Sequence, residues 1–267
     1  MRRRSALGGL AAAALAGAAH AADGWTPCRI QDGALVVSAK AAGLSGDFVL
    51  DTGTAQTAID ATQASLAGIE TDHVRAPLRL AGRRYSGLDM AVAALDARTR
   101  NQPTPITGVL GADVLAGLTL EVIPDPCRLR LTARAAPIRA LAVLPVELGA
   151  DGPTIMASVT DGGRSARGRF RVSTGADVGV RLEPRLARAD GLLAEHEVAT
   201  LRGLSMDDVL IEEPSAAIAD QDEAGLAGEI GEPVWSAYGF QLDLRRGRLA
   251  LFDPQQQKAR RRRSGGP

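Results

Sequence analysis

Apolar residues fall in short stretches along this chain, and several stretches alternate apolar with polar positions. Turn-forming residues separate them, which is the pattern of short β-strands rather than of long amphipathic helices. A brief helical segment is expected after each of two Gly-x-x-Gly elements, which begin at Gly108 and Gly228. A closing strand hairpin is predicted after each, over residues 118–131 and 238–251. The pattern therefore predicts a mostly β protein.

The chain contains an internal repeat. The segment FVLDTGT at Phe48–Thr54 returns as FRVSTGA at Phe170–Ala176, so Asp51 and Ser173 stand at equivalent positions. Other landmarks repeat at an offset of 120 to 122 residues: Val37 and Val159, Gly82 and Gly203, Gly108 and Gly228, and Arg128 and Arg248. Such a repeat indicates a duplicated structural unit. We expect a first lobe over residues 22–134 and a second over residues 140–253, linked near residues 133–144.

Both ends of the chain are basic. Arg2–Arg4, an Ala/Gly/Leu run at residues 6–19 and the small-residue site at Ala21 predict a secretory signal over residues 1–21. The run is shorter than the roughly 20 residues of a membrane span, so a retained anchor is the weaker interpretation. The paired arginines suit a twin-arginine route, and a general secretory route fits as well. Residues 254–267 are expected to form a disordered basic tail. The prediction is a periplasmic or secreted protein, without a membrane segment after cleavage.

The charge balance and the cysteines limit which partners, cross-links and metal sites are expected. Lys plus Arg and Asp plus Glu both number 31, so the net charge gives no reason to expect a nucleic-acid partner. In an oxidising compartment Cys28 and Cys127 are predicted to form a disulfide, and the alternative is two buried free thiols. His73 and His196 have no ligand spacing with the cysteines, so no metal is predicted. No cofactor is predicted either.

The ordered motifs are characteristic of a known family. Asp51-Thr52-Gly53 is followed by the element Val109–Leu115 (VLGADVL) and then by the closing hairpin. In this order the motifs resemble those of the retropepsin-like and pepsin-like aspartic peptidases, in particular bacterial retropepsin-like proteins. The resemblance covers nearly the whole chain after the signal, strongly in the first unit and weakly in the second. It implies two tandem aspartic-protease-like β-barrel lobes with a cleft between them, and a short helix after each Gly-x-x-Gly element.

The resemblance also implies roles for the residues of the two turns. Family chemistry uses two carboxylates about 3 Å apart that share one proton. Asp51 would hold the attacking water, Thr52 would tie the two turns together, Gly53 would permit the close turn and Thr54 would donate a hydrogen bond to the carboxylate. The facing turn would be Ser173, Thr174 and Gly175.

Ser173 departs from this pattern, because a hydroxyl can position water but does not hold a proton in reserve near neutral pH. The second turn is then either a lobe-packing element or a modified active turn. A nucleophilic Ser173 would need a histidine, and His196 has no motif around it. Asp177 follows the turn and is expected to face solvent or to cap a local backbone N–H.

Other residues receive weaker assignments. The hairpins around Gly82 and Gly203 are flap candidates, and Arg83, Arg84 and Tyr85 would either contact substrate or belong to an exposed turn. Asp113 is expected to cap or face out from the short helix. Glu229 places a charge where the first unit has Val109.

Two functions fit these observations. The first is an exported aspartic endopeptidase of retropepsin type acting on peptide or protein substrates. The second is a catalytically inactive relative, a pseudo-protease that binds extended peptide or a protein partner in the cleft. A monomer is favoured over a homodimer, since the second unit already fills the place of a second subunit.

Overall fold

The computed structural model describes residues 24–95, 99, 102–149, 152–192, 199–219 and 225–256. The predicted signal, His196 and residues 257–267 lie outside the described residues. The predicted disordered tail begins at residue 254, but Pro254 to Gln256 form a helical turn, where Asp253 Oδ1 accepts hydrogen bonds from the amides of Gln255 and Gln256. No helix among the described residues is long and apolar enough to span a membrane.

The first half of the chain forms a closed β-barrel. Its sheet has the order β2-β3-β4-β8-β5-β7-β6, and pairing of β3 with β6 closes the ring. The strands are β2 (Arg29–Gln31), β3 (Ala34–Ala41), β4 (Leu44–Leu50), β5 (Ala58–Asp60), β6 (His73–Leu80), β7 (Arg83–Ala93) and β8 (Ile106–Leu110). The predicted first barrel is confirmed.

The second half forms a more open, half-barrel sheet of the same kind. Its strands run in the order β16-β19-β15-β20-β14-β13-β17-β18, with β12 beside β13. They are β12 (Glu147–Gly149), β13 (Gly152–Thr160), β14 (Ser165–Val172), β15 (Val180–Leu182), β16 (Ala199–Thr200), β17 (Gly203–Met206), β18 (Val209–Glu212), β19 (Ser215–Ile218) and β20 (Gly228–Ile230).

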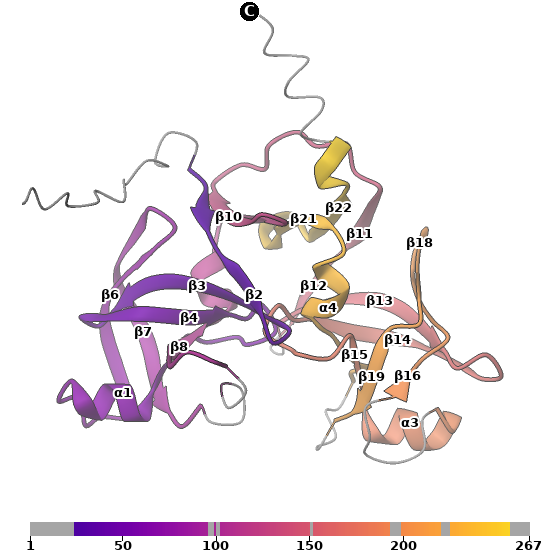
Figure 1. Cartoon of the computed structure of the whole chain (residues 1–267), viewed down its shortest axis with the longest axis horizontal. Coiled ribbons are helices and arrows are strands. Elements are labelled where there is room, and N and C mark those ends of the chain that lie inside the picture. Colours follow the sequence, from indigo (N-terminus) through magenta and orange to yellow (C-terminus); the bar gives the residue numbers. More distant parts are fainter. Residues whose placement is uncertain are drawn as a thin grey trace, which may run out of the picture.

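A third sheet joins the halves. Its order is β1-β10-β9-β21-β22-β11, and its strands are β1 (Thr26–Pro27), β9 (Thr119–Pro124), β10 (Cys127–Thr132), β11 (Ala142–Pro145), β21 (Gly239–Asp243) and β22 (Arg248–Phe252). Both closing hairpins were predicted, but not that β9 would pair with β21. Figure 1 shows the first half in indigo and purple at the left and the second in orange at the right, with the joining sheet above their junction.

The helices bounded within the described residues are short. Besides the turn at Pro254 to Gln256, they include α1 (Ala61–Leu66), the 3₁₀ helices η1 (Ala112–Leu115) and η2 (Leu244–Arg246), α3 (Pro184–Asp190) and α4 (Glu232–Trp235). The helices expected after the Gly-x-x-Gly elements are η1 and α4, so this prediction is confirmed. One core runs through the molecule, from Phe48 and Leu50 in the first barrel to Phe170 and Trp235 in the second half.

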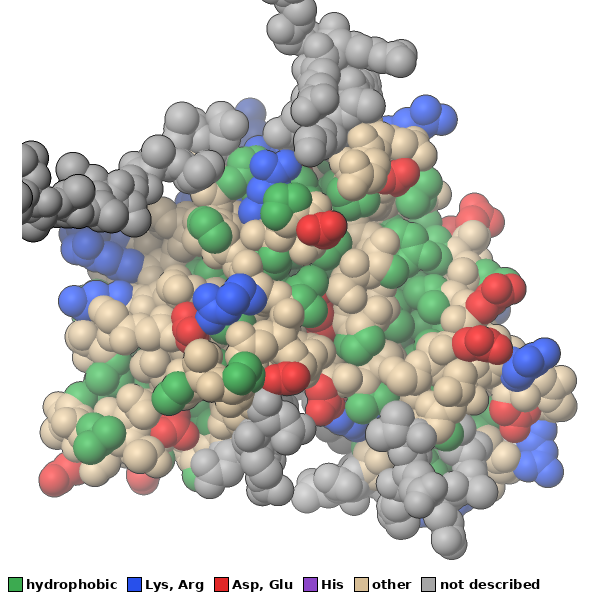
Figure 2. All heavy atoms as spheres, viewed as in Figure 1, with side chains coloured by type: hydrophobic (Ala, Val, Ile, Leu, Met, Phe, Trp, Pro, Cys, Tyr) green, Lys and Arg blue, Asp and Glu red, His purple; other side chains and the backbone are tan. Residues whose placement is uncertain are grey.

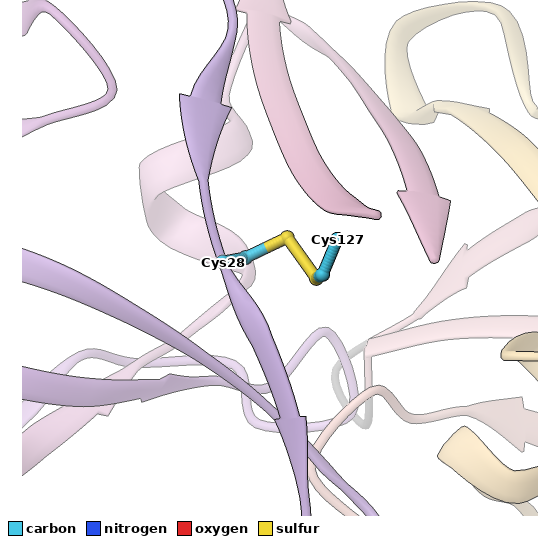
Figure 3. Close-up of a disulfide and its surroundings, with 2 residues drawn as sticks. All are labelled: Cys28 and Cys127. Carbon is cyan, nitrogen blue, oxygen red and sulfur yellow. A yellow bond between two sulfur atoms is a disulfide. The ribbon is translucent and has the colours of Figure 1, made fainter. Parts of the chain in front are cut away.

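The predicted disulfide is present. Cys28 lies between β1 and β2, and Cys127 begins β10, so the bond fastens the start of the first barrel to the joining sheet (Figure 3). The amide of Cys28 also donates to the carbonyl of Cys127 at 3.1 Å. A disulfide is compatible with a secreted or periplasmic protein.

Helix α4 contains a carboxyl group in an unusual position. Glu232 is fully buried, and neither of its carboxyl oxygens accepts a hydrogen bond from the described part of the chain. Burial penalises the charged form and raises the pKa of Glu232 well above its ordinary value of 4.5. The second half therefore contains a buried glutamate that favours its neutral form.

We expect Glu232→Gln to remove part of the pH dependence of stability. A carboxyl with a raised pKa keeps its proton to higher pH in the folded than in the unfolded chain, so the folded state loses stability as the pH rises above 4.5. Between about pH 4 and pH 7.5, urea denaturation should show the free energy of unfolding of the variant rising relative to that of the wild type. The exposed Glu147→Gln is the control, and a variant that tracks the wild type at both pH values would contradict the expectation.

Candidate functional site

Two turns of the duplicated unit face each other where the halves meet. Each follows a strand that pairs in parallel with another: β4 with β8, and β14 with β20. The Thr52 hydroxyl donates to the carbonyl of Val172 at 2.6 Å, and the Thr174 hydroxyl donates to the carbonyl of Leu50 at 2.6 Å. The amide of Thr52 donates to Thr174 Oγ1 at 3.2 Å. The structure thus places Thr52 and Thr174 in reciprocal, buried contact across the interface.

The Asp51 carboxylate is held from several sides. Its Oδ1 accepts from the amide of Gly53 at 2.9 Å and from the Ser173 hydroxyl at 2.8 Å. Its Oδ2 accepts from the Thr54 hydroxyl at 2.7 Å. This arrangement suits a group that orients water and accepts a proton.

The second turn copies the first without its acid. Ser173 stands where Asp51 stands in the first unit, and its Oγ accepts from the amide of Gly175 at 3.3 Å. Ala176 replaces Thr54, so the second turn also lacks the hydroxyl donor of the first. Ser173 is fully buried and faces Asp51 rather than solvent.

Gly53 and Gly175 allow the turns to approach. A Cβ atom on Gly175 would lie 2.6 Å from Asp51 Cγ and 3.0 Å from its Oδ2. A Cβ atom on Gly53 would lie 2.8 Å from Ser173 Cβ and 3.1 Å from an oxygen of Glu229. Neither position has room for a side chain, which explains the glycine in both turns.

A polar pocket opens over these turns, with a volume of about 140 Å³. One water molecule needs roughly 10–15 Å³ by this measure, so the pocket has room for a reacting water. Its lining comprises Asp32, Ala34, Asp51, Gln102, Ser173, Gly175, Ala176, Asp177, Arg181 and Glu229. In the space-filling view, acidic side chains lie beside a notch at the junction of the two halves (Figure 2).

Glu229 is a site residue that the sequence reasoning did not assign to the pocket. It lies on β20, between Arg171 of β14 and Arg181 of β15 in the strand register. Its Oε2 lies 3.4 Å from Arg181 Nη1, and its side chain is 15% exposed. The available signal was the repeat itself, since the equivalent pair in the first barrel is the apolar Val49 and Val109.

Burial raises the pKa of Glu229 above its ordinary value, and the nearby charge of Asp51 raises it further. The guanidinium groups of Arg181 and Arg171 and a hydrogen bond with Ser173 act in the opposite direction, and the net shift is upward. Glu229 is thus coupled to both Asp51 and Ser173.

The flap candidates lie elsewhere. Gly82, Arg83, Tyr85 and Gly203 do not line the pocket that contains Asp51. Arg83 Nε donates to the carbonyl of Leu131, and the Tyr85 hydroxyl donates to the carbonyl of Val114 at 2.6 Å. Burial raises the pKa of Tyr85 to about 12, as expected for a side chain that packs within its own barrel. These residues therefore lie outside the pocket that contains Asp51, and their contact with substrate stays a prediction.

The two hairpins differ in where their glycine lies. Gly82, with Ala81, forms the turn between β6 and β7 as predicted, and Arg84 follows it in β7 beside a separate surface pocket. Gly203 instead begins β17, and the turn of its hairpin lies at Asp207 and Asp208.

The two other aspartates have local structural contacts. Asp113 was expected to cap or face out from the short helix. The N-cap of η1 is Gly111, but Asp113 lies in the first turn and its Oδ1 accepts from the amide of Val114 at 2.9 Å. Its carboxylate also accepts from the amide and the hydroxyl of Thr57, at 2.9 and 2.7 Å. Asp177 is half exposed and pairs with Arg181 at 2.9 Å. No group of His, Cys, Asp and Glu side chains that could hold a metal ion occurs in the described ranges.

Comparison with solved structures gives a distant match. The aspartic proteinase from Irpex lacteus superimposes with a TM-score of 0.53 at 12% sequence identity, covering 86% of this chain and 96% of that chain. The fold is similar to that of an aspartic proteinase. No protein-family model matches the chain. No curated protein matches it either. At this identity the likeness to the aspartic proteinase concerns the fold, and the chemistry must be argued from the pocket.

We expect Thr174→Val to destabilise the junction of the halves. The change removes the bond to the Leu50 carbonyl and the acceptor for the Thr52 amide, leaving buried groups without partners at a cost of about 1–3 kcal/mol each. Urea denaturation measures the loss. Thr71→Val is the matched control, because the exposed Thr71 hydroxyl also donates to a backbone carbonyl, at 2.8 Å. Equal losses in the two variants would show that the reciprocal contact is not special.

Proposed function

We propose that this protein is an exported aspartic peptidase that hydrolyses peptide bonds with water activated by Asp51. The observation that supports it best is the Asp51 carboxylate itself. It accepts three hydrogen bonds and lines a polar pocket. The turn that carries it is hydrogen-bonded to the Ser173 turn of the other half. The similarity in fold to an aspartic proteinase supports the same assignment. Peptide or protein substrates would enter between the halves.

Each residue of the two turns has a specific role in the proposed reaction. Asp51 takes a proton from the attacking water, while Thr54 and the Gly53 amide keep its carboxylate oriented. Ser173 fixes Oδ1 from the opposite turn. A second group must give a proton to the oxygen of the peptide carbonyl. Negative charge develops on that oxygen as water attacks, and an unpaired charge is costly in a buried site.

We place the protein outside the cytoplasm. The predicted signal over residues 1–21 and cleavage after Ala21 support export, by a twin-arginine or a general secretory route. The Cys28–Cys127 bond suits an oxidising compartment. A monomer suffices for the proposed chemistry, because both turns of the site come from one chain.

We expect Asp51→Asn to abolish peptide cleavage. Asparagine keeps the shape of the side chain but cannot accept the proton of water, and loss of one acid/base group typically costs about 10² to 10⁴ in rate. The measurement is cleavage of fluorescently labelled casein and of a mixed peptide library by residues 22–267, from about pH 3 to pH 8.

The control for this experiment is Asp72→Asn, which changes an exposed aspartate remote from the pocket. It should cleave as the wild type does. Activity that persists unchanged in Asp51→Asn would remove Asp51 from the mechanism and with it the proposed function.

A second candidate is favoured by one observation, the serine at position 173. In this alternative the site has lost its second acid, and the protein binds extended peptide or a protein partner without cutting it. Ser173→Asp tests it directly. If the wild type binds labelled peptides without cleaving them and the variant gains pH-dependent cleavage, the protein is a pseudo-protease. Efficient cleavage by the wild-type monomer would reject this alternative.

A further inference from the structure

The duplicated turns define where a second carboxyl group belongs. In the first turn, the carboxylate of Asp51 packs against Gly175 of the other turn, with its Oδ2 at 3.0 Å from the Cβ position of that glycine. The symmetric place is against Gly53. An oxygen of Glu229 lies there, 3.1 Å from the Cβ position of Gly53. A carboxyl group thus occupies the place of the missing acid, although it comes from a different strand.

The strand register explains how Glu229 reaches this place. β20 lies between β14 and β15, and it runs parallel to β14, the strand that directly precedes Ser173. Positions 228 and 230 face the other side of the sheet from Glu229, because successive residues of a strand face alternate sides. Glu229 therefore points into the pocket, beside Ser173 and opposite Asp51. An aspartate at position 173 would occupy this place directly, whereas Glu229 reaches it from the neighbouring strand with its longer side chain.

The surrounding groups link the two carboxyls. Ser173 donates a hydrogen bond to Asp51 and also interacts with Glu229. Arg181 and Arg171 face Glu229 from the neighbouring strands, and Asp32 and Asp177 line the same pocket. With Glu229 protonated and Asp51 charged, a continuous hydrogen-bonded chain can run from Glu229 through the Ser173 hydroxyl to Asp51.

From this geometry we infer that Glu229 is the second catalytic acid of the site, paired with Asp51 through Ser173. The inference rests on the proposed peptidase function and names the group that gives the proton. Ser173 is then a positioning residue between two carboxyls rather than the remnant of a lost one.

The proton balance of the reaction closes with these two groups. Asp51 takes a proton from the water molecule as the water oxygen bonds to the carbon of the peptide carbonyl. At the same time Glu229 gives its proton to the carbonyl oxygen, which yields a neutral diol. As the C–N bond breaks, Asp51 gives its proton to the departing nitrogen. Glu229 takes a proton from one diol hydroxyl as the C=O bond reforms. Both carboxyls return to their starting states, and no further reactant is needed.

Glu229 also has a purely structural explanation, as the partner of Arg181. The chain offers a matched control for this, because Glu147 pairs with Arg169 at the same 3.4 Å distance on the exposed surface. We expect Glu229→Gln to lower kcat by about 10² to 10⁴ with little change in KM, and to remove the fall in rate on the alkaline side of the pH profile. Glu147→Gln should match the wild type. Equal behaviour of the two variants would overturn the inference.

A rescue experiment separates a catalytic from a structural role. Glu229→Val restores the residue type that stands at the equivalent position in the first barrel, and it should inactivate the protein. Adding Ser173→Asp to that variant places an acid directly on the second turn and should recover cleavage. Failure of the double variant to exceed Glu229→Val, although it folds by circular dichroism, would contradict the inference. So would an inert wild type that Ser173→Asp alone activates.

A readout without catalysis distinguishes failure of the inference from failure of the proposed function. The carboxyl carbon of Glu229 can be followed by NMR in protein labelled with ¹³C-glutamate, and assigned with Glu229→Gln. Interacting carboxyls titrate as a pair, so Asp51→Asn should move the Glu229 midpoint downward. The Glu147 midpoint should not move. A shifted midpoint without cleavage of any peptide supports the carboxyl pair and rejects the peptidase function. Cleavage that needs Asp51 but shows an unmoved Glu229 midpoint rejects the inference and keeps the function.

Discussion

The reciprocal hydrogen bonds of Thr52 and Thr174 are the interaction on which the rest of the site depends. Each hydroxyl satisfies a buried carbonyl of the opposite strand, so neither turn can move without leaving a polar group unpaired. This lock brings Gly53 and Gly175 against the side chains of the facing turns. The carboxylate of Asp51 is consequently fixed at the junction rather than carried on a mobile loop. The joining sheet, in which β9 pairs with β21, holds the same two halves together from the other side.

Within this fixed frame, a carboxyl group can enter the pocket from more than one position. Ser173 leaves a small, hydroxyl-bearing side chain where an acid would stand, and Glu229 extends from the neighbouring strand into the space beside it. The first barrel has Val49 and Val109 at the corresponding strand positions, whereas the second has Arg171 and Glu229. A charged pair beside a serine thus replaces an apolar pair beside an aspartate. The two changes are complementary, and neither is understood alone.

This explains which parts of the site the sequence could predict. The two turns, the helices η1 and α4 and the closing hairpins follow from local patterns that repeat at a nearly constant offset, so the sequence predicts them, whereas α1, α3 and η2 were not predicted. The position of Glu229 depends on the register between β20 and β14, which are more than fifty residues apart, and its neighbours gave no local motif. The place of the flap candidates could not be predicted for a related reason. A glycine in an alternating stretch indicates a turn, but it does not indicate which surface that turn faces. Here Arg83 donates to Leu131 of the joining sheet and Tyr85 to Val114 of η1, and neither lines the pocket.

Stability and the proposed chemistry favour the same side of the pH scale. Glu229 and Glu232 lie three residues apart, and burial raises the pKa of both. A carboxyl with a raised pKa makes the folded state lose relative stability as the pH rises through the range above its ordinary value. For Glu232 this is a structural cost, since no described group donates to its oxygens. For Glu229 the same burial favours the protonated form, which would give its proton to the carbonyl oxygen in the first step and regain it in the second. An acidic medium therefore suits both the packing of α4 and a protonated acid beside Asp51.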